Sequence, residues 1–533
     1  MMAETGTISW HLSSMHPKGH PYPYLPSSLF KTLPFSTQAE RRRRANLSWV
    51  LGYTLDRVNV LGDDHGYGHT GCVNALSWAR NGDILLSGGD DTTVRLWRME
   101  TSDTIQDYPF MSHCVINTGH RANIFSAQML PQSSRIATAA GDTQVRVFDV
   151  QSALAPTNVA QDLTETVLST NQSCIRVIRC HSDRVKRVVV EESSDLFLSL
   201  SEDGTVRQHD LRTSHSCRGE SCPTPLVEIG HELSTISLSP LTPYQLVVAG
   251  RSPYGYLYDR RHLPRTLKQE WGLAPRSGKE LTTCVRKFGR KRLKERQMRP
   301  DHITGCRMSS SNGHEVVLSY SDDGVYLFST KDEENHANDM SKSPVTKSAN
   351  LMHVLDIDAP EHERTSWSAE PSEPFSALDV EDGEPGMPIV MPRRRYTGSR
   401  NIATVKDVNF LGPEDEWVTS GSDDGNFFVW EKSSGRLHGI YEGDSSVVNM
   451  VEGHPHLPLV AVSGIDTTIK LFSPTSSSSA FSKMAQAQEI MENNQRTTTT
   501  RFTRYNIGAL LAEARIASGG EPITVQIPEC VGQ

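Results

Sequence analysis

Short runs of alternating hydrophobic and polar residues recur along most of the chain. In the stretch "ILLSGGDDTTVRLW", residues 84–97, two such runs flank a group of Gly, Asp and Thr residues. Alternation with a period of two predicts β-strands, and the small polar residues between the runs predict tight turns. Three strands of this kind are recognisable in each of seven segments, which are residues 68–97, 119–149, 180–210, 230–259, 303–328, 405–430 and 446–472.

These seven segments are internal repeats with the pattern of WD repeats. Radial repetition of small antiparallel sheets forms a β-propeller, so the sequence predicts an all-β fold, a seven-bladed WD-repeat β-propeller with an N-terminal helical extension and disordered insertions. A ring of sheets is stable only if its last blade has no open edge. Residues 55–62, in which Val58 and Val60 alternate with polar neighbours, are predicted to supply the outer strand of the blade at 446–474.

Polar residues recur at equivalent positions of the repeats. His69, Ser87, Asp91 and Trp97 match the positions that form a buried hydrogen-bonded set in WD repeats. A buried Asp beside a His resembles a catalytic pair, but repetition favours a structural role, since buried polar groups must be paired. In other repeats an Asp also stands six positions before the bulky residue that ends the repeat, which is Trp430 in the sixth repeat. We assign the same structural role to Asp142, Asp203, Asp424, Trp430 and Asp466.

The remaining segments divide the chain further. We expect a disordered N-terminus at 1–36, a helical segment at 37–56 after an Arg cluster, the propeller at 57–474, and a tail at 475–533 with helical spacings. The segment at 37–56 is interpreted either as a helix packed on the propeller or as one presented to a partner. Two insertions are expected, a basic one at 286–299 and an acidic one at 331–388. The basic run fits a localisation patch, a phosphate-contacting loop or a solvated surface.

Composition narrows the function. The 533 residues carry a net charge of −9, which argues against direct nucleic-acid binding, and the sequence shows no apolar run that predicts a signal peptide or membrane span. We therefore expect a nuclear or cytoplasmic protein. P-loop, nucleophile-elbow and zincin motifs are missing, so we predict neither an enzyme nor a cofactor.

Cysteine and histidine residues near position 215 raise the question of a metal. Nine cysteines in a long chain fit reduced thiols better than a disulfide framework. His209, His215, Cys217 and Cys222 are conceivable zinc ligands, but their spacing is not a zinc-knuckle signature. Free thiols are the favoured interpretation, and no metal site is predicted.

Two successive repeats end in Asp-x-Arg, within "VRQHDLRT" at 206–213 and "GYLYDRRH" at 255–262. Residues that follow the third strand of a blade lie on one common face of the disc, so Arg212 and Arg261 are predicted to be neighbours there. A planar, permanently charged guanidinium suits contact with a partner protein. The alternative is that Asp210 and Asp259 pair with these arginines purely within each blade.

The motifs "HDLR" and "YDRR" resemble the docking motif of WD-repeat substrate receptors of cullin-4 RING ubiquitin ligases. Longer stretches, including "GHRANIFSAQMLP" and "VVNMVEGHPHLPLVAVSGIDTTIKLFSP", are similar in particular to the nuclear-receptor-interaction-protein subgroup. The resemblance implies that the chain binds the damaged-DNA-binding adaptor and, through it, the cullin-4 ligase core, and that it presents an unknown protein substrate. The residues it implicates in adaptor binding are Asp210, Arg212, Asp259, Arg261 and, in the N-terminal helix, Arg42, Arg43, Trp49 and Leu51. The alternative function is a non-ligase scaffold in a chromatin or RNA-processing assembly.

Overall fold

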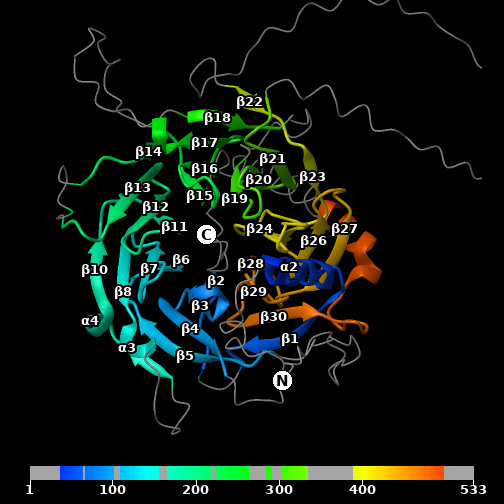
Figure 1. Cartoon of the computed structure of the whole chain (residues 1–533), viewed down its shortest axis with the longest axis horizontal. Coiled ribbons are helices and arrows are strands. Elements are labelled where there is room, and N and C mark those ends of the chain that lie inside the picture. Colours follow the sequence, from blue (N-terminus) through cyan, green and yellow to red (C-terminus); the bar gives the residue numbers. More distant parts are fainter. Residues whose placement is uncertain are drawn as a thin grey trace, which may run out of the picture.

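A computed structural model describes residues 37–63, 67–100, 108–154, 165–214, 217, 222–262, 284–290, 302–333 and 388–496. Seven sheets are arranged radially around a central axis (Figure 1). The predicted seven-bladed propeller is thereby confirmed. The helical extension is present as α2 (Thr37–Leu51), and no helix among the described residues is long and apolar enough to cross a membrane.

The strands of blades 1 to 3 follow one another along the chain. Blade 1 contains β2 (Val73–Ala79), β3 (Ile84–Gly89), β4 (Thr93–Met99), β5 (Phe110–Asn117) and, parallel to β5, the short β9 (Thr166–Leu168). Blade 2 contains β6 (Ile124–Met129), β7 (Arg135–Ala140), β8 (Val145–Asp149) and β10 (Cys174–Ile178). Blade 3 contains β11 (Val185–Val190), β12 (Leu196–Ser201), β13 (Thr205–Asp210) and β14 (Val227–Glu228).

Blades 4 to 7 complete the ring. Blade 4 contains β15 (Leu233–Leu238), β16 (Gln245–Gly250), β17 (Gly255–Asp259), β18 (Cys284–Phe288) and β22 (Ile389–Val390). Blade 5 contains β19 (Ile303–Met308), β20 (Glu315–Tyr320), β21 (Val325–Ser329) and β23 (Arg394–Tyr396). Blade 6 contains β24 (Val408–Leu411), β25 (Trp417–Gly421), β26 (Asn426–Glu431) and β27 (Leu437–Glu442). Blade 7 contains β28 (Val448–Gly453), β29 (Val460–Gly464), β30 (Ile469–Pro474) and β1 (Leu55–Leu61).

Blade 7 closes the ring as the sequence predicts. Strand β1, which precedes every other strand in the chain, pairs antiparallel with β30, from Leu55 opposite Pro474 to Leu61 opposite Ile469. Leu55 and Leu61 are buried in the cores between blades. The two ends of the propeller are thus held together by backbone hydrogen bonds and by apolar packing, and the outer edge of β30 is covered by β1.

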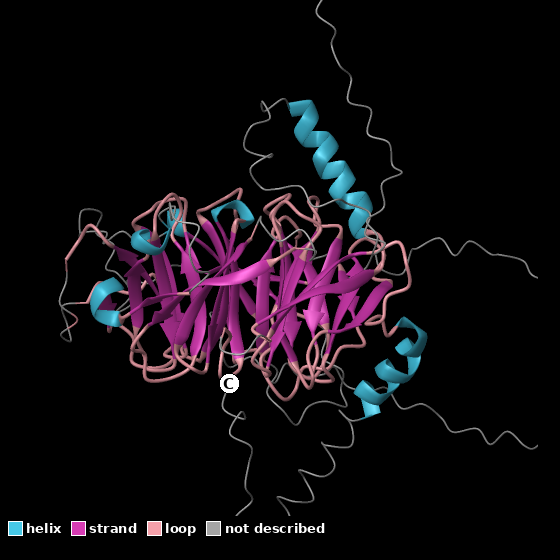
Figure 2. Ribbon diagram, turned by 90° about the horizontal axis from the view of Figure 1, so that it is seen from below, coloured by secondary structure: helices cyan, strands magenta, loops and turns pink. Residues whose placement is uncertain are grey.

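The disc has two distinct faces. In every blade the first and third strands end at the same end of the sheet, because neighbouring strands are antiparallel. Helix α2 contacts the turn between β24 and β25 and rises from that face (Figure 2). We call it the α2 face. A helix at 487–496 contacts Gly398 and Asp424, at the other end of blade 6, so it lies on the opposite face.

The predicted insertions begin and end elsewhere than expected. Residues 286–288 belong to β18, where Lys287 is buried, and Arg290 forms an ion pair with the buried Asp323. The predicted basic insertion at 286–299 therefore begins too early. Its first residues belong to blade 4, where Lys287 is buried and Arg290 is paired with Asp323. After the acidic segment, β22 pairs in parallel with β18 before the chain returns to blade 5. The N-terminus at 1–36 and most of both insertions and of the tail lie outside the described residues.

The shorter helical elements occupy connections. They are η1 (Arg80–Gly82), α3 (Gln151–Leu154), α4 (Thr170–Ser173), η3 (Arg260–His262) and η6 (Met484–Gln486). Of these, η3 carries Arg261 directly after β17.

Candidate functional site

Arg261 is held by Asp259 at the end of the third strand of blade 4. Its Nε and Nη2 atoms donate to Oδ1 and Oδ2 of Asp259 at 3.0 and 2.6 Å, and its backbone N–H donates to Oδ1 at 2.9 Å. The guanidinium carbon lies 3.6 Å from the centroid of the Tyr244 ring. The side chain of Asp259 is 6% exposed, whereas that of Arg261 is 60% exposed. The arginine is therefore fixed in direction and open to solvent.

Arg212 repeats this geometry on blade 3. Its Nε and Nη2 donate to Oδ1 and Oδ2 of Asp210 at 2.9 and 2.8 Å, and its side chain is 65% exposed. The hydrogen bonds from Arg212 lower the pKa of Asp210 to about 2, so the carboxylate is charged at neutral pH. Both Asp-x-Arg ends thus present a guanidinium held by two hydrogen bonds.

One turn of blade 3 contacts both Asp-x-Arg ends. Arg260, next to Arg261, donates to Glu191 at 2.8 Å and to Gln208 at 3.1 Å. At the other end of the same turn, the carbonyl of Asp195 accepts the backbone N–H of Leu211 at 2.9 Å. The structure therefore brings the two Asp-x-Arg ends to neighbouring positions on the α2 face.

His209 occupies the place of the aromatic residue in the motif of blade 3. Its Nε2 lies 2.7 Å from Oγ of Ser199, as Nε1 of Trp97 lies 2.7 Å from Oγ of Ser87 in blade 1. His209 is buried and packs on Phe197. The imidazole thus forms a hydrogen bond with the serine hydroxyl at the position where the indole N–H does so in blade 1. With His in place of Trp, the end of β13 stays in register with β12. Because Nε2 of His209 bonds Ser199, this nitrogen does not serve as a metal ligand.

Helix α2 has one side on the propeller and another in solvent. Arg44 donates to the carbonyl of Pro413 at 2.6 Å and pairs with Glu414 at 2.9 Å, and Ser48 bonds Glu416. Val50 is completely buried. Trp49 is 54% exposed, and Arg42 is exposed on the same outward side. Packing of the helix on the propeller is therefore observed for one side, and its presentation to a partner through the exposed side stays a prediction.

The inward side of α2 covers part of a central cavity. This cavity has a volume of about 1020 Å³. It is lined by Arg43 and Leu51 of α2 and by residues of the turns that follow the first strands of the blades, such as Gln132, Glu191 and Asp415. Leu51 is only 8% exposed, and its predicted role in binding a partner stays a prediction. Its side chain is used to pack the helix onto the propeller.

The polar set predicted for blade 1 is present and recurs in blades 2 and 3. Nδ1 of His69 lies 3.0 Å from Oδ2 of Asp91, and its Nε2 lies 2.8 Å from Oγ of Ser87. Burial raises the pKa of Asp91, but the hydrogen bond and charge of His69, with two backbone N–H groups, outweigh it and bring the pKa to about 2. The sequence prediction omitted the histidines that pair with Asp142 and Asp203, which are His120 and His181.

Asp424 and Asp466 differ from this pattern. Both accept the backbone N–H two residues ahead, at 3.1 and 2.9 Å, and so hold the turn as predicted. No histidine pairs with them in the described structure. Lys406 pairs with Asp423 in blade 6, and Lys470 bonds Asp466 in blade 7. Trp430 likewise donates to the carbonyl of Thr397 instead of to a hydroxyl. The sequence signal was available, because these two repeats lack the opening Gly-His.

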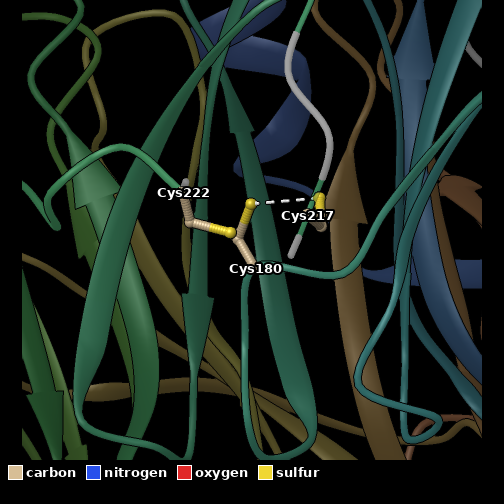
Figure 3. A group of neighbouring side chains, drawn as sticks. All are labelled: Cys180, Cys217 and Cys222. Carbon is tan, nitrogen blue, oxygen red and sulfur yellow. Dashed lines mark hydrogen bonds between the residues drawn. The ribbon is translucent and has the colours of Figure 1, made fainter. Parts of the chain in front are cut away.

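Three cysteines form a separate group at the border of blades 2 and 3. The Sγ atoms of Cys180, Cys217 and Cys222 all lie within 4.8 Å of one another (Figure 3). Burial and the two neighbouring thiols raise the pKa of Cys180. The sequence analysis named Cys217 and Cys222 but missed Cys180, which is 37 residues from Cys217 in the chain.

Comparison with known proteins agrees with the observed fold. The model of the WD domain, G-beta repeat matches residues 64–98, 112–149, 172–210 and 392–431. The chain carries WD repeats. It is 33% identical over 315 residues to the WD repeat protein iqw1 of Schizosaccharomyces pombe, which covers 58% of this chain and 36% of that protein.

Two further relatives carry more informative names. The WD-repeat chain is 31% identical over 273 residues to human DDB1- and CUL4-associated factor 6, covering 50% of this chain and 27% of that protein. It is 23% identical over 653 residues to the WD and tetratricopeptide repeats protein 1 of Mus musculus, covering 85% and 91%. The chain thus spans about a third or less of the yeast and human relatives, and most of the mouse relative.

Proposed function

We propose that this protein is a substrate receptor of a cullin-4 RING ubiquitin ligase that binds DDB1, the damaged-DNA-binding adaptor, through its α2 face. The observation that carries the proposal is the pair of Asp-x-Arg ends on adjacent blades, each with a fixed and exposed arginine. The name of the human relative, which associates that protein with DDB1 and CUL4, supports the same partner.

The geometry explains why two such arginines suit a protein interface. Each guanidinium is already oriented by its aspartate, so little side-chain entropy is lost when a partner carboxylate or carbonyl binds the remaining N–H groups. Arg261 is further restrained by its contact with Tyr244. Surface ion pairs such as Arg251 with Glu232 are equally exposed, but these two arginines differ from them because the same geometry recurs at equivalent positions of adjacent blades.

Helix α2 would add a second contact with the adaptor. It leaves Arg42 and Trp49 exposed on its outward side, on the same face of the disc as the two arginines. An exposed tryptophan next to basic residues is typical of interface anchors. We therefore assign Arg42 and Trp49 to adaptor binding, and Arg43 and Leu51 to the cavity side of the helix.

A receptor of this kind acts without chemistry of its own. Binding the adaptor on the α2 face leaves the opposite face for a protein substrate, which is then held beside the ubiquitin-charged part of the ligase. The local concentration of the substrate rises, and a rare encounter becomes an intramolecular one.

The proposal is tested by measuring the affinity of the purified protein for purified DDB1. The double variant Arg212→Ala/Arg261→Ala is expected to bind at least about a hundredfold more weakly than wild type, as for two central interface arginines. Arg251→Ala is the matched control. Arg251 is 62% exposed and paired with Glu232, but it follows β16 and so lies on the opposite face.

The control should bind like wild type, and all three proteins should show the same thermal unfolding. Wild-type protein that fails to bind DDB1 would overturn the proposal in favour of the scaffold function. Equal losses in the double variant and in the control would show that surface charge, and not the Asp-x-Arg geometry, attracts the adaptor.

A further inference from the structure

The three-cysteine group joins two segments that are far apart in the sequence. Cys180 follows β10, the outer strand of blade 2, whereas Cys217 and Cys222 belong to the long connection between β13 and β14 of blade 3. In Figure 3 the sulfur of Cys180 lies between the other two side chains, with a hydrogen bond to Cys217. All three residues are partly buried.

The distances suit a metal better than a disulfide. The Sγ atoms of Cys180 and Cys217 are 3.6 Å apart. Two thiolates bound to one tetrahedral Zn²⁺ at the usual Zn–S length are separated by roughly 3.8 Å, whereas the sulfur atoms of a disulfide lie about 2 Å apart. The backbone N–H of Arg179 donates to Sγ of Cys217 at 3.3 Å, an orientation that stabilises negative charge on this sulfur.

We propose that Cys180, Cys217 and Cys222 bind a zinc ion, with a solvent ligand at the fourth position. Three thiolates form a soft ligand set that selects Zn²⁺ over hard cations. Binding forms three Zn–S bonds, releases the three thiol protons to solvent, and requires no oxidant or reductant.

The local structure gives this ion a task. The fourth strand of blade 3 consists only of Val227–Glu228, compared with the eight residues of β5 in blade 1. The residues described between Asp210 and Val227, which are 211–214, 217 and 222–226, lie outside these strands. Among them, Thr213 contacts blade 2, because its carbonyl accepts a hydrogen bond from Arg176. A zinc ion would fasten this connection to Cys180 and close the edge of blade 2.

The test uses the full-length protein, reduced and freed of metal under chelation, then titrated with Co²⁺ and with Zn²⁺. We expect one Co²⁺ per chain, with the intense sulfur-to-cobalt absorption of thiolate coordination, and displacement of Co²⁺ by Zn²⁺. The variants Cys180→Ser, Cys217→Ser and Cys222→Ser should each lose most of this absorption. Cys284→Ser is the matched control, because Cys284 is also partly buried but lies in β18, outside the group.

The competing results are distinguishable. No thiolate absorption in a folded, reduced wild-type protein would overturn the proposal, as would equal absorption in the variant that lacks all three cysteines. A disulfide between Cys180 and Cys217 in protein purified without reductant, with no metal uptake after reduction, would also overturn it. Each of these results is independent of DDB1 binding, so the zinc site and the ligase function can fail separately.

Discussion

Asp259 and Arg261 form a pair in which the acid is buried and the base is exposed. Such an arrangement fixes the direction of the guanidinium, and the value of the motif should therefore depend on geometry as well as charge. Arg261→Lys keeps the charge but loses the two-pronged contact with Asp259 and the planar contact with Tyr244. We expect about tenfold weaker DDB1 binding in a titration by calorimetry. Arg251→Lys should change nothing, and an Arg261→Lys variant that binds like wild type would reduce the motif to simple charge attraction.

The His-Asp sets and the turn aspartates should differ in their effect on stability. Asp91→Ala leaves the buried His69 without its carboxylate, so we expect the free energy of unfolding to fall by about 2–4 kcal/mol. Asp424→Ala removes a turn contact and a hydrogen bond from Asn494, and a loss of about 1 kcal/mol is expected. Thermal unfolding of both variants measures this difference. Equal losses would contradict the assignment of different roles.

His454 should make the fold sensitive to acid. Its Nδ1 accepts the backbone N–H groups of His456 and Leu457, both at 2.9 Å, and its Nε2 bonds the carbonyl of Gly82 in blade 1. Burial, followed by the charge of the neighbouring His456, lowers the pKa of His454 to about 3. A second ring proton would also break both bonds to Nδ1. The unfolded chain therefore binds a proton that the folded chain does not between pH 6.5 and the lowered value.

Its contribution to stability is complete well above pH 6.5 and is lost as the pH falls toward about 3, by up to about 5 kcal/mol. His454→Asn retains a local acceptor and does not titrate. Chemical denaturation between pH 7 and pH 4 should show a flatter pH dependence for this variant. A slope identical to that of wild type would assign the acid sensitivity to other groups.

Ring closure should depend on the inward residues of β1. Leu61 is buried between blades 7 and 1, so Leu61→Ala is expected to cost about 3 kcal/mol and to lower the melting temperature. The neighbouring Val60 is only partly buried, and Val60→Ala should cost less than about 1 kcal/mol. Similar melting temperatures for the two variants would indicate that β1 does not close the ring in solution. For the same reason, truncations intended to remove α2 must end before β1 begins at Leu55.

Much of the architecture could be predicted because it repeats. The alternating runs predicted the strands of the blades. Because Asp210 and Asp259 end the third strands of adjacent blades, Arg212 and Arg261 could be predicted to lie on the same face of the disc. What could not be predicted depends on contacts between distant segments. Nothing near Cys217 in the sequence indicates Cys180, and nothing in α2 shows that Leu51 packs inward while Trp49 remains exposed. The absence of a His-Asp pair in blade 6 could be predicted from the missing Gly-His, but the pair of Lys406 and Asp423 could not, since a buried lysine has no local signature.

The central claim, that DDB1 binds the α2 face, is tested most directly by photo-crosslinking. A photoreactive amino acid is placed at one exposed position at a time, at Asn46 on α2, at Ser214 beside the Asp-x-Arg end of blade 3, and at Arg251 on the opposite face. We predict crosslinks to DDB1 from Asn46 and Ser214 and none from Arg251. Crosslinks from Arg251 alone, or from none of the three positions in a protein that binds DDB1, would contradict the account.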